Sequence, residues 1–450
     1  MSRQRERVAV IGAGISGLTV ARLLRPAYDV VVLEASDRVG GHALTTVVPD
    51  RDGNPLRVDA GVCMFYSTGY PRFFEMLRLL KVPLVRSEIT VEFHFLESGQ
   101  RYYLDMNAPW RTAASSLWHR SQHWLVQDGL RFYRHARSVG PPSPATLVRP
   151  VGSMENADTA AEGPSLGEYL AGESYSEEFR VLLSFLCGAT WTLNQKGIDQ
   201  LPLSFVIQNM RALGFLPSIR HGVWHHVPGS VGRYLDALAA PMREQVRLLH
   251  EVERVEREPD GVVVYGGGRA DRFDQVVFAI PPRAALARLA APHDDEREVL
   301  DAFSSQSHSV VFTSDREAVG AWSPSDVTLF AATDGFNRSL AAGKEFVFRA
   351  GFANLTKMCG YPTADPLYMW YQFPDVAWPR QQFARVDFAT PCFNRETVAA
   401  QARHAEISGR DRIHFCGASW VNGIHEGGVV SALRVAERLG CSMSALESGS

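Results

Sequence analysis

The sequence lacks the features that would place it outside the class of ordinary globular proteins. Its six cysteines are widely scattered, with no CxxC pair and no metal-ligand spacing. No stretch approaches the roughly 18 uninterrupted apolar residues of a membrane-spanning helix, and the N-terminus lacks the basic-then-apolar order of a signal peptide. We therefore expect free thiols in a reducing compartment and a cytoplasmic protein without a metal site.

The charge shows no strong bias of either sign. The formal net charge is −3 at pH 7, from 46 basic and 49 acidic residues, which argues against nucleic acid as a partner. Hydrophobic residues make up 46% of the chain, so it can bury a large core and is not disordered. At 450 residues, two domains are expected, and large α/β enzymes can interleave theirs.

A nucleotide-binding pattern opens the chain. The hydrophobic pattern predicts a βαβ unit, with strands at residues 8–11 and 30–34 and a helix at residues 16–25 between them. A GxGxxG sequence joins the first strand to the helix. Gly12 permits the tight turn, Gly14 lets the backbone approach a pyrophosphate, and Gly17 lets the helix pack closely on the strand.

The residues around this turn point to an adenine dinucleotide. A phosphate would meet free N–H groups near Ile15 and Ser16, at the positive end of the helix. Glu34 ends the second strand, where it can accept hydrogen bonds from both hydroxyls of an adenosine ribose. This fingerprint by itself leaves NAD and FAD open.

The segment directly after Glu34 decides between these two cofactors. It runs from Ala35 to His42 and contains Gly40 and Gly41, which let the main chain pass beside the pyrophosphate and the ribityl chain. Arg38 adds positive charge there. Because NAD sites need no such second loop, the sequence predicts an FAD-binding oxidoreductase.

Five segments carry a resemblance to a known superfamily. They are residues 12–17, 40–42, 58–61 (VDAG), 166–170 (LGEYL) and 415–429, which contains FCGASW and HEGGV. With them the chain resembles the flavin amine oxidase and phytoene-desaturase-like superfamily of FAD oxidoreductases. It is most similar to the bacterial group known only as predicted NAD/FAD-binding proteins, and His42 stands where most members have Arg.

The resemblance implies an α/β fold in which a Rossmann-like FAD-binding domain, of the glutathione-reductase-like type, is interleaved with an α+β substrate-binding domain. The FAD domain would comprise residues 1–90, 225–300 and 395–445. The substrate domain, with a helical lid, would comprise residues 91–224 and 301–394. The composition of residues 140–163, rich in Pro, Gly and Ser, predicts a flexible loop between these elements.

The resemblance also implies roles for individual residues. Val252 would pair its backbone with the adenine, and His42 would donate a hydrogen bond near the phosphates. The segment Ala60, Gly61 and Val62 would pass along the flavin. At the pyrimidine end of the flavin, the resemblance places Gly417, Glu426, Gly427, Gly428 and Val429. A helix that starts near Gly427 would aim its N–H groups at N1 and O2, where the reduced flavin carries charge.

Two histidines are candidates for a catalytic role. Amine oxidases of the superfamily usually carry a lysine that holds a water near N5, just before an apolar strand of the substrate domain. His308 stands at that position here. No aromatic pair is recognisable beside the last motif apart from Trp420, so both departures favour chemistry other than amine oxidation. His425, beside the expected flavin, is the second candidate.

Cys392 and Cys416 are the thiols that a covalent flavin link would require. A buried apolar thiol is the commoner fate of such residues, so we expect FAD to bind non-covalently.

The substrate leaves fewer traces. Residues 109–137 interleave aromatics with arginines, which fits either a surface for lipid-like or carrier-bound substrates at a membrane or an ordinary lid helix with its aromatics turned inward. The leading hypothesis is hydride removal from an apolar, unsaturated substrate, with desaturation or double-bond isomerisation. The alternatives are an amine or amino-acid oxidase and a non-catalytic FAD-bound redox sensor or scaffold.

Overall fold

The computed structural model describes residues 5–50, 52–95, 99–108, 123–139, 163–216, 222–320, 328–332, 348–363, 365–371 and 378–449. The loop predicted at 140–163 lies almost wholly outside the described residues, as does the first half of the aromatic and arginine-rich region. Within the described ranges, no helix is long and apolar enough to cross a membrane.

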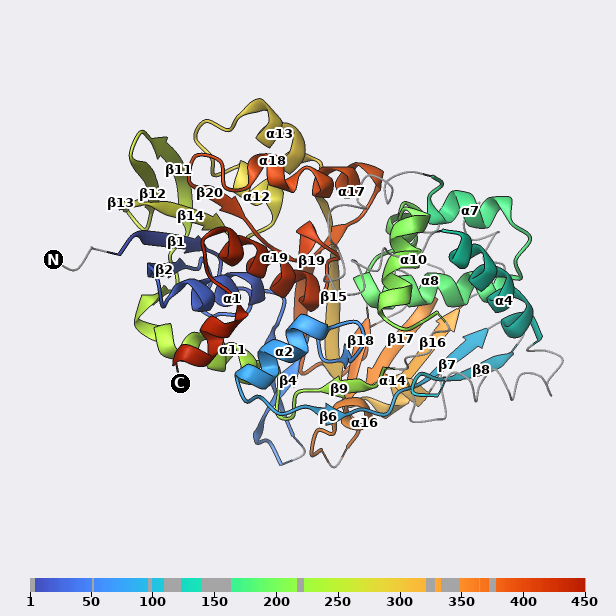
Figure 1. The fold of residues 1–450 in the computed structure, drawn as a ribbon. Coiled ribbons are helices and arrows are strands. Elements are labelled where there is room, and N and C mark those ends of the chain that lie inside the picture. Colours follow the sequence, from blue (N-terminus) through green and yellow to red (C-terminus); the bar gives the residue numbers. More distant parts are fainter. Residues whose placement is uncertain are drawn as a thin grey trace.

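A five-stranded parallel sheet forms the centre of the first domain (Figure 1). Its order is β10 (Val246–Arg247), β2 (Asp29–Leu33), β1 (Arg7–Ile11), β14 (Gln275–Phe278) and β20 (Ile413–Phe415). The strands are short apolar runs, as expected for a parallel sheet that is covered on both faces. Three stretches that lie far apart in the sequence therefore meet in one sheet.

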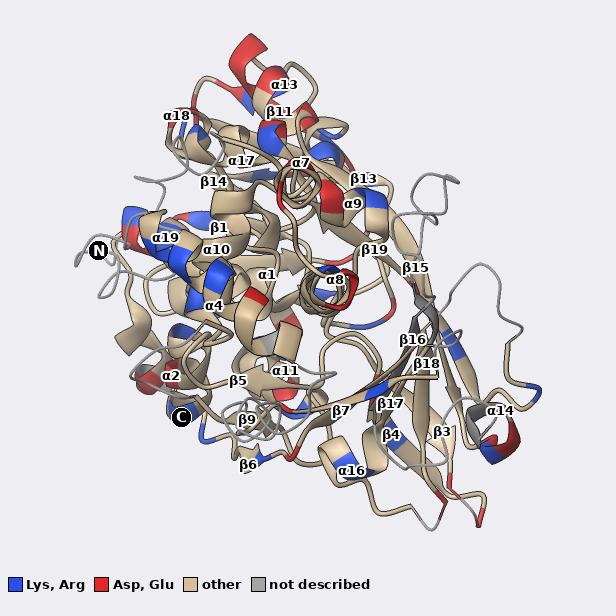
Figure 2. Cartoon of the chain, turned by 90° about the vertical axis from the view of Figure 1, so that its right-hand side faces the viewer, with Lys and Arg blue, Asp and Glu red and all other residues tan. Residues whose placement is uncertain are grey.

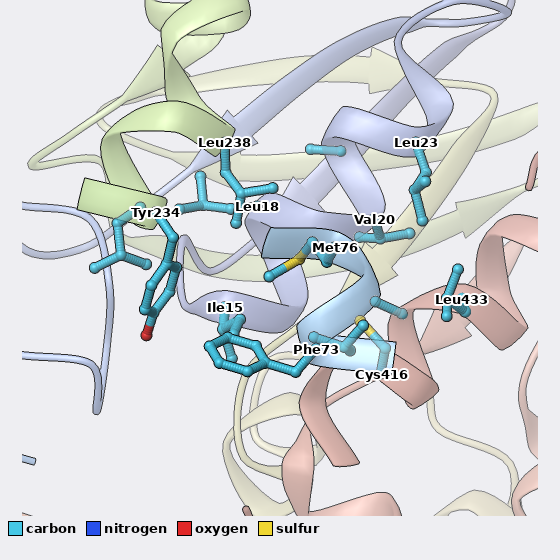
Figure 3. Packing of buried hydrophobic residues seen from close by; sticks show 14 of the residues in the cluster. Ile15, Leu18, Val20, Leu23, Phe73, Met76, Tyr234, Leu238, Cys416 and Leu433 are labelled. Atoms are coloured by element: carbon cyan, nitrogen blue, oxygen red, sulfur yellow. The ribbon is translucent and has the colours of Figure 1, made fainter. Parts of the chain in front are cut away.

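Four helices cover one face of this sheet. They are α1 (Ile15–Leu24), α2 (Pro71–Leu79), α11 (Gly232–Ala239) and α19 (His425–Arg438). Figure 3 shows their packing in one apolar cluster, to which Leu18, Phe73 and Leu433 contribute from three different helices. Every residue of α1 is buried, because sheet and neighbouring helices surround it.

A separate antiparallel sheet covers the opposite face with α12 (Pro282–Leu286) and α13 (Asp294–Asp301). Its strands are β11 (Val252–Glu258), β12 (Gly261–Gly266) and β13 (Arg269–Phe273). The sequence predicts a second βαβ-like patch after residue 230. Only β10 and β14 of that patch join the parallel sheet, because the strands between them are linked by two-residue turns and pair with one another.

A seven-stranded sheet forms the second domain, and only its β16–β7 pair is parallel. Its order is β19 (Ala384–Cys392), β15 (Ser304–Thr313), β18 (Tyr368–Tyr371), β17 (Phe348–Asn354), β16 (Thr328–Ala332), β7 (Thr90–Phe95) and β8 (Arg101–Asp105). Helices lie beside this sheet in Figure 1: α4 (His123–Ser138), α7 (Leu166–Gly172), α8 (Glu177–Trp191), α9 (Gln195–Asp199) and α10 (Leu203–Ala212). They share an apolar core of their own.

The other described elements are shorter. They are β3 (Thr45–Pro49), β4 (Pro55–Asp59), β5 (Phe65–Tyr66), β6 (Val85–Arg86), β9 (Trp224–His226), α14 (Arg316–Gly320), α16 (Leu355–Cys359), α17 (Arg395–Ala402), α18 (His404–Ile407) and the 3₁₀ segments Ala240–Gln245, Ala418–Trp420 and Met443–Gly449. Hydrogen bonds cross the domain boundary directly: the indole of Trp191 donates to the carbonyl of Asn422 at 2.8 Å. The space between the domains is therefore bounded by well-packed elements on both sides.

Candidate active site

A cavity of about 600 Å³ lies between the two domains. Of the site residues expected from the sequence, it is lined by Gly12, Gly14, Ile15, Ser16, Glu34, Gly40, Gly41, His42, Ala60, Gly61, Val62, His308, Gly417 and His425. Residues from widely separated parts of the chain thus meet at one site. The parallel strands β1 and β2 end here, which is where nucleotides bind in open α/β sheets.

The glycine turn before α1 has the shape that a pyrophosphate requires. Gly12 has a φ of +101°, which a residue with a side chain rarely adopts. A Cβ on Gly17 would lie 1.9 Å from the carbonyl oxygen of Gly12, so only glycine lets α1 sit this close to the turn. At Gly14 the nearest atom to a Cβ is the Gly40 carbonyl oxygen at 3.9 Å, so this position opens on the cavity.

Glu34 is held at the end of β2 by main-chain donors. Its carboxylate accepts hydrogen bonds from the N–H groups of Ala13 at 2.7 Å and Ser36 at 2.9 Å. The side chain still lines the cavity beside the glycine turn. This is the geometry in which a carboxylate can receive two ribose hydroxyls.

The second glycine loop closes over the first. Gly40 has a φ of +119°, and a Cβ there would lie 2.4 Å from the carbonyl oxygen of Ala43. Its N–H donates to the Ala13 carbonyl at 2.8 Å, which ties the two loops together. The guanidinium of Arg38 folds back onto the carbonyls of Val39 and Gly41 and does not line the cavity. Arg38 therefore stabilises the loop through these carbonyls and does not face the cavity.

Three stacked rings form another part of the cavity wall. His42 and His308 both stack on Phe388, at centroid distances of 5.8 Å and 5.3 Å. Phe388 lies directly opposite His308 in the β15–β19 ladder, and its edge would be 3.3 Å from a Cβ on Gly61. Burial, with the nearby His42, lowers the pKa of His308 to about 4, so His308 is a neutral imidazole at physiological pH.

His425 also lines the cavity, at the first position of α19. Its Nε2 is 2.7 Å from the hydroxyl of Tyr234, and Phe65 and Phe73 pack around the ring. Burial lowers its pKa to about 3. Both histidines named from the sequence therefore reach the cavity, 117 positions apart in the sequence and in different domains.

Several expected cofactor residues lie outside the cavity lining: Gly17, Ala35, Arg38, Val252, Glu426, Gly427, Gly428 and Val429. The carboxylate of Glu426 accepts hydrogen bonds from the N–H groups of Arg72 and Phe73 and so caps α2. A Cβ on Gly428 would lie 2.9 Å from Ile15, so this glycine lets α19 approach α1. Glu426 and Gly428 therefore support the helices that border the cavity.

Another part of the cavity is an apolar arm, contributed mostly by the second domain. It is lined by Met64, Ile89, Val91, Met106, Phe185, Leu186, Phe215, Trp224, Met358, Met369 and Tyr371. Among the described lining residues, the only carboxylate is that of Glu34 and there is no lysine. Trp420 lies outside the lining and packs against Phe303 and His404 in the core of the first domain.

The sequence did not reveal part of this site. Phe388 and Thr390 reach the cavity only through the register of β19 against β15, which no local pattern encodes. Ala279 and Ile280 also line it, and here a signal existed, because they follow a strand predicted to belong to the first domain. The strand's end at Pro281 marked that position.

The shape and chemistry of the cavity fit FAD. The open position at Gly14 leaves room for the pyrophosphate, and Glu34 is placed for the ribose. The uncapped N-terminus of α19 lies at the cavity wall, where helix N–H groups favour negative charge. Cys392 and Cys416, the thiols considered for a covalent link, both lie outside the cavity lining.

Comparisons with known proteins agree with this assignment. The profile of the family described as flavin containing amine oxidoreductase matches residues 15–357. The "Putative flavin-containing monoamine oxidase AofH" of Mycobacterium tuberculosis is 27% identical over 62% of this chain and 58% of its own length. The flavin-containing amine oxidase A of Equus caballus is 24% identical over 61% of this chain and 49% of its own. The matched region thus spans about half the length of these relatives.

Solved structures share the fold over nearly the whole chain. Cyclohexylamine oxidase from Brevibacterium oxydans has a TM-score of 0.66 at 18% identity, covering 97% of this chain and 100% of that one. The fatty acid isomerase from P. acnes has a TM-score of 0.63 at 15% identity, covering 98% and 99%. These matches confirm the predicted fold class. The chain belongs to the flavin-containing amine oxidoreductase family, and its cofactor is FAD.

Proposed function

We propose that the chain is an FAD-dependent oxidoreductase that acts on C–H or C=C bonds of an apolar, unsaturated substrate, such as a lipid or a polyene. The observation that carries the proposal is the apolar arm of the cavity. Its described lining offers no carboxylate to an ammonium group and no lysine. The fold by itself does not choose a substrate, because one neighbour is named for an amine and another for a fatty acid.

The work of the protein follows from this lining. Bound FAD supplies an acceptor for hydride. The apolar arm holds the substrate by burial and excludes water from the reacting carbon. His308 is neutral, and its Nδ1 lies 3.1 Å from the Thr390 hydroxyl. Its Nε2 is then the nitrogen that would exchange a proton with the substrate. Loss of hydride and proton would form a double bond, and their return to another carbon would move one.

The α4 helix fits a covering role beside the arm. Phe132 is 3% exposed and Trp124 packs on two apolar clusters, so the described aromatics of residues 123–137 face the protein. Basic residues are spaced along the helix (Figure 2). We propose that α4, the described part of the aromatic and arginine-rich region 109–137, serves as a lid helix.

Amine oxidation is the second candidate. Sequence similarity to proteins named as amine oxidases favours it, and Tyr70, Trp224 and Tyr371 in the cavity wall offer aromatic faces to a cation. A peroxide assay separates the two functions, because an amine oxidase releases peroxide with its substrate and an isomerase does not.

The direct test mixes the holoenzyme anaerobically with unsaturated fatty acids, polyenes and, in parallel, primary and secondary amines. We expect the unsaturated compounds to bleach the visible flavin absorbance or to emerge with shifted double bonds. Bleaching by amines alone, with peroxide formed in air, would replace the proposal with the second candidate. A flavin that no compound in either set reduces would instead favour a redox sensor or scaffold.

A variant of the arm tests the substrate class. Leu186→Asn places an amide in the apolar lining, and we expect kcat/KM for the unsaturated substrate to fall about tenfold because the amide must be desolvated. Leu130→Asn is the matched control, since Leu130 is an exposed helix leucine on α4 outside the cavity lining. Equal effects of the two substitutions would contradict binding in this arm.

A further inference from the structure

His425 stands at the positive end of a helix that borders the cavity. It is the first residue of α19, a 14-residue helix whose N-terminus has no side-chain cap. Its ring lines the cavity together with Ile424 and Gly417. The unpaired N–H groups of the helix and the imidazole therefore face the same space.

Tyr234 reaches His425 from outside the cavity. Its ring is fully buried on α11, and Figure 3 shows the hydroxyl pointing away from Leu18 and Leu238. The hydroxyl oxygen is 2.7 Å from Nε2 of His425. Phe73 meets both rings edge to face, so neither ring can turn without disturbing the core.

The direction of this hydrogen bond follows from burial. Among the described residues, Nε2 is the single partner of the Tyr234 hydroxyl. If Nε2 carried the imidazole proton, the hydroxyl hydrogen would be buried without an acceptor, which is unfavourable. Tyr234 therefore donates, Nε2 accepts, and the neutral imidazole carries its proton on Nδ1. Since Nε2 is occupied, Nδ1 is the nitrogen left for the cavity.

We infer that Tyr234 fixes His425 as the Nδ1-protonated tautomer, and that His425 donates this N–H to the flavin ring of bound FAD. Tyr234 is a positioning residue, because it acts only through His425. The donor lies beside the positive end of α19, so both favour the reduced flavin, which carries negative charge. The inference rests on FAD binding and not on the substrate proposed above.

The midpoint potential of bound FAD tests the inference without any substrate. In Tyr234→Phe the hydroxyl is lost and the proton is free to move to Nε2. We expect binding of reduced relative to oxidised FAD to weaken about tenfold, which lowers the potential of this two-electron couple by about 30 mV. Tyr28→Phe is the matched control: the Tyr28 hydroxyl donates to the Leu439 carbonyl at 2.8 Å, at the other end of α19. Its potential should equal that of the wild type.

Two substitutions of His425 separate its nitrogens. The amide nitrogen of Asn sits near the position of Nδ1, whereas that of Gln sits near Nε2. His425→Asn should therefore keep a donor toward the flavin and a near-native potential, while His425→Gln should match Tyr234→Phe. Each variant is compared at full FAD content and with a native-like melting temperature.

Two results would overturn the inference. One is an equal potential for the Asn and Gln variants, because a structural role does not distinguish the two nitrogens. The other is weaker FAD binding with an unchanged potential in Tyr234→Phe, which would place the N–H on the phosphates or the ribityl chain. Because the potential is read with redox dyes, failure of the substrate proposal leaves this test intact.

Discussion

Gly14 and Gly17 of the same fingerprint have different roles, and substitution of each by alanine distinguishes these roles. A Cβ at Gly17 overlaps the Gly12 carbonyl oxygen, whereas one at Gly14 enters the cavity. Gly17→Ala should destabilise the fold by about 1–3 kcal/mol, because the turn or α1 must shift. Gly14→Ala should leave the stability of the FAD-free protein within about 0.5 kcal/mol and weaken FAD binding. Urea unfolding of the apoprotein and fluorescence titration with FAD measure the two effects.

Gly129 supplies the control for these substitutions. It lies inside α4, and a Cβ there would meet nothing within 4 Å. Gly129→Ala should be neutral or stabilising, since alanine is the better helix former. If Gly14→Ala weakened the apoprotein as much as Gly17→Ala, the division of roles between cavity and packing would be wrong.

At the scale of elements, carboxylates from distant segments cap two helices of the FAD domain. Glu426 of α19 accepts from the first N–H groups of α2, and Asp59 at the end of β4 accepts from the N–H of Val231 before α11. Burial raises the pKa of Asp59 to about 6 and that of Glu426 to about 7. Each carboxylate therefore joins elements that the sequence keeps far apart, and its charge is costly to keep buried.

The raised pKa of Glu426 makes stability depend on pH. Between its ordinary value of 4.5 and about 7, the folded state binds more protons than the unfolded state, so stability falls as pH rises through this window. The loss attributable to this group is about 3 kcal/mol. The free energy of unfolding, measured with urea at several pH values in this window, should change less steeply with pH in Glu426→Gln than in the wild type. Parallel slopes for the two proteins would show that Glu426 does not titrate there.

The first domain shows which strands and strand pairings the local sequence pattern can predict. Strands β1 and β2 and helix α1 follow from short apolar runs, a glycine turn and a capping position within one stretch of chain. The valines of β11 and β12 equally predict strands, yet these strands pair with each other and with β13 and do not join the parallel sheet. Apolar periodicity identifies a strand and leaves its partner open.

At the scale of the whole molecule, the cavity draws its walls from both domains. The wall residues Gly14 and Glu34 follow strands β1 and β2 of the parallel sheet, while His308 and Phe388 belong to the seven-stranded sheet. His42 already joins the two, since its Nε2 lies 2.7 Å from the Ala389 carbonyl. A ligand that fills the space between them should therefore stabilise both domains together.

FAD binding should raise the free energy of unfolding by about 2.7 kcal/mol at a free concentration one hundred times its Kd. Differential scanning calorimetry of apo and holo protein should show one transition, or two that both shift upward with FAD. Tryptophan fluorescence and flavin release should then report the same midpoint. A shift confined to one of two transitions would mean that FAD is held by a single domain.

The sequence by itself determined the cofactor and the fold class, because the phosphate turn, the ribose acid and the second glycine loop are local features within one βαβ unit. It also marked His308 and His425 as candidates, through their places in motifs. Only the tertiary structure decided that Phe388 lies between His42 and His308 and that Tyr234 meets His425. These contacts arise from cross-strand register and helix packing between segments far apart in the chain, and such contacts leave no local signature to be read.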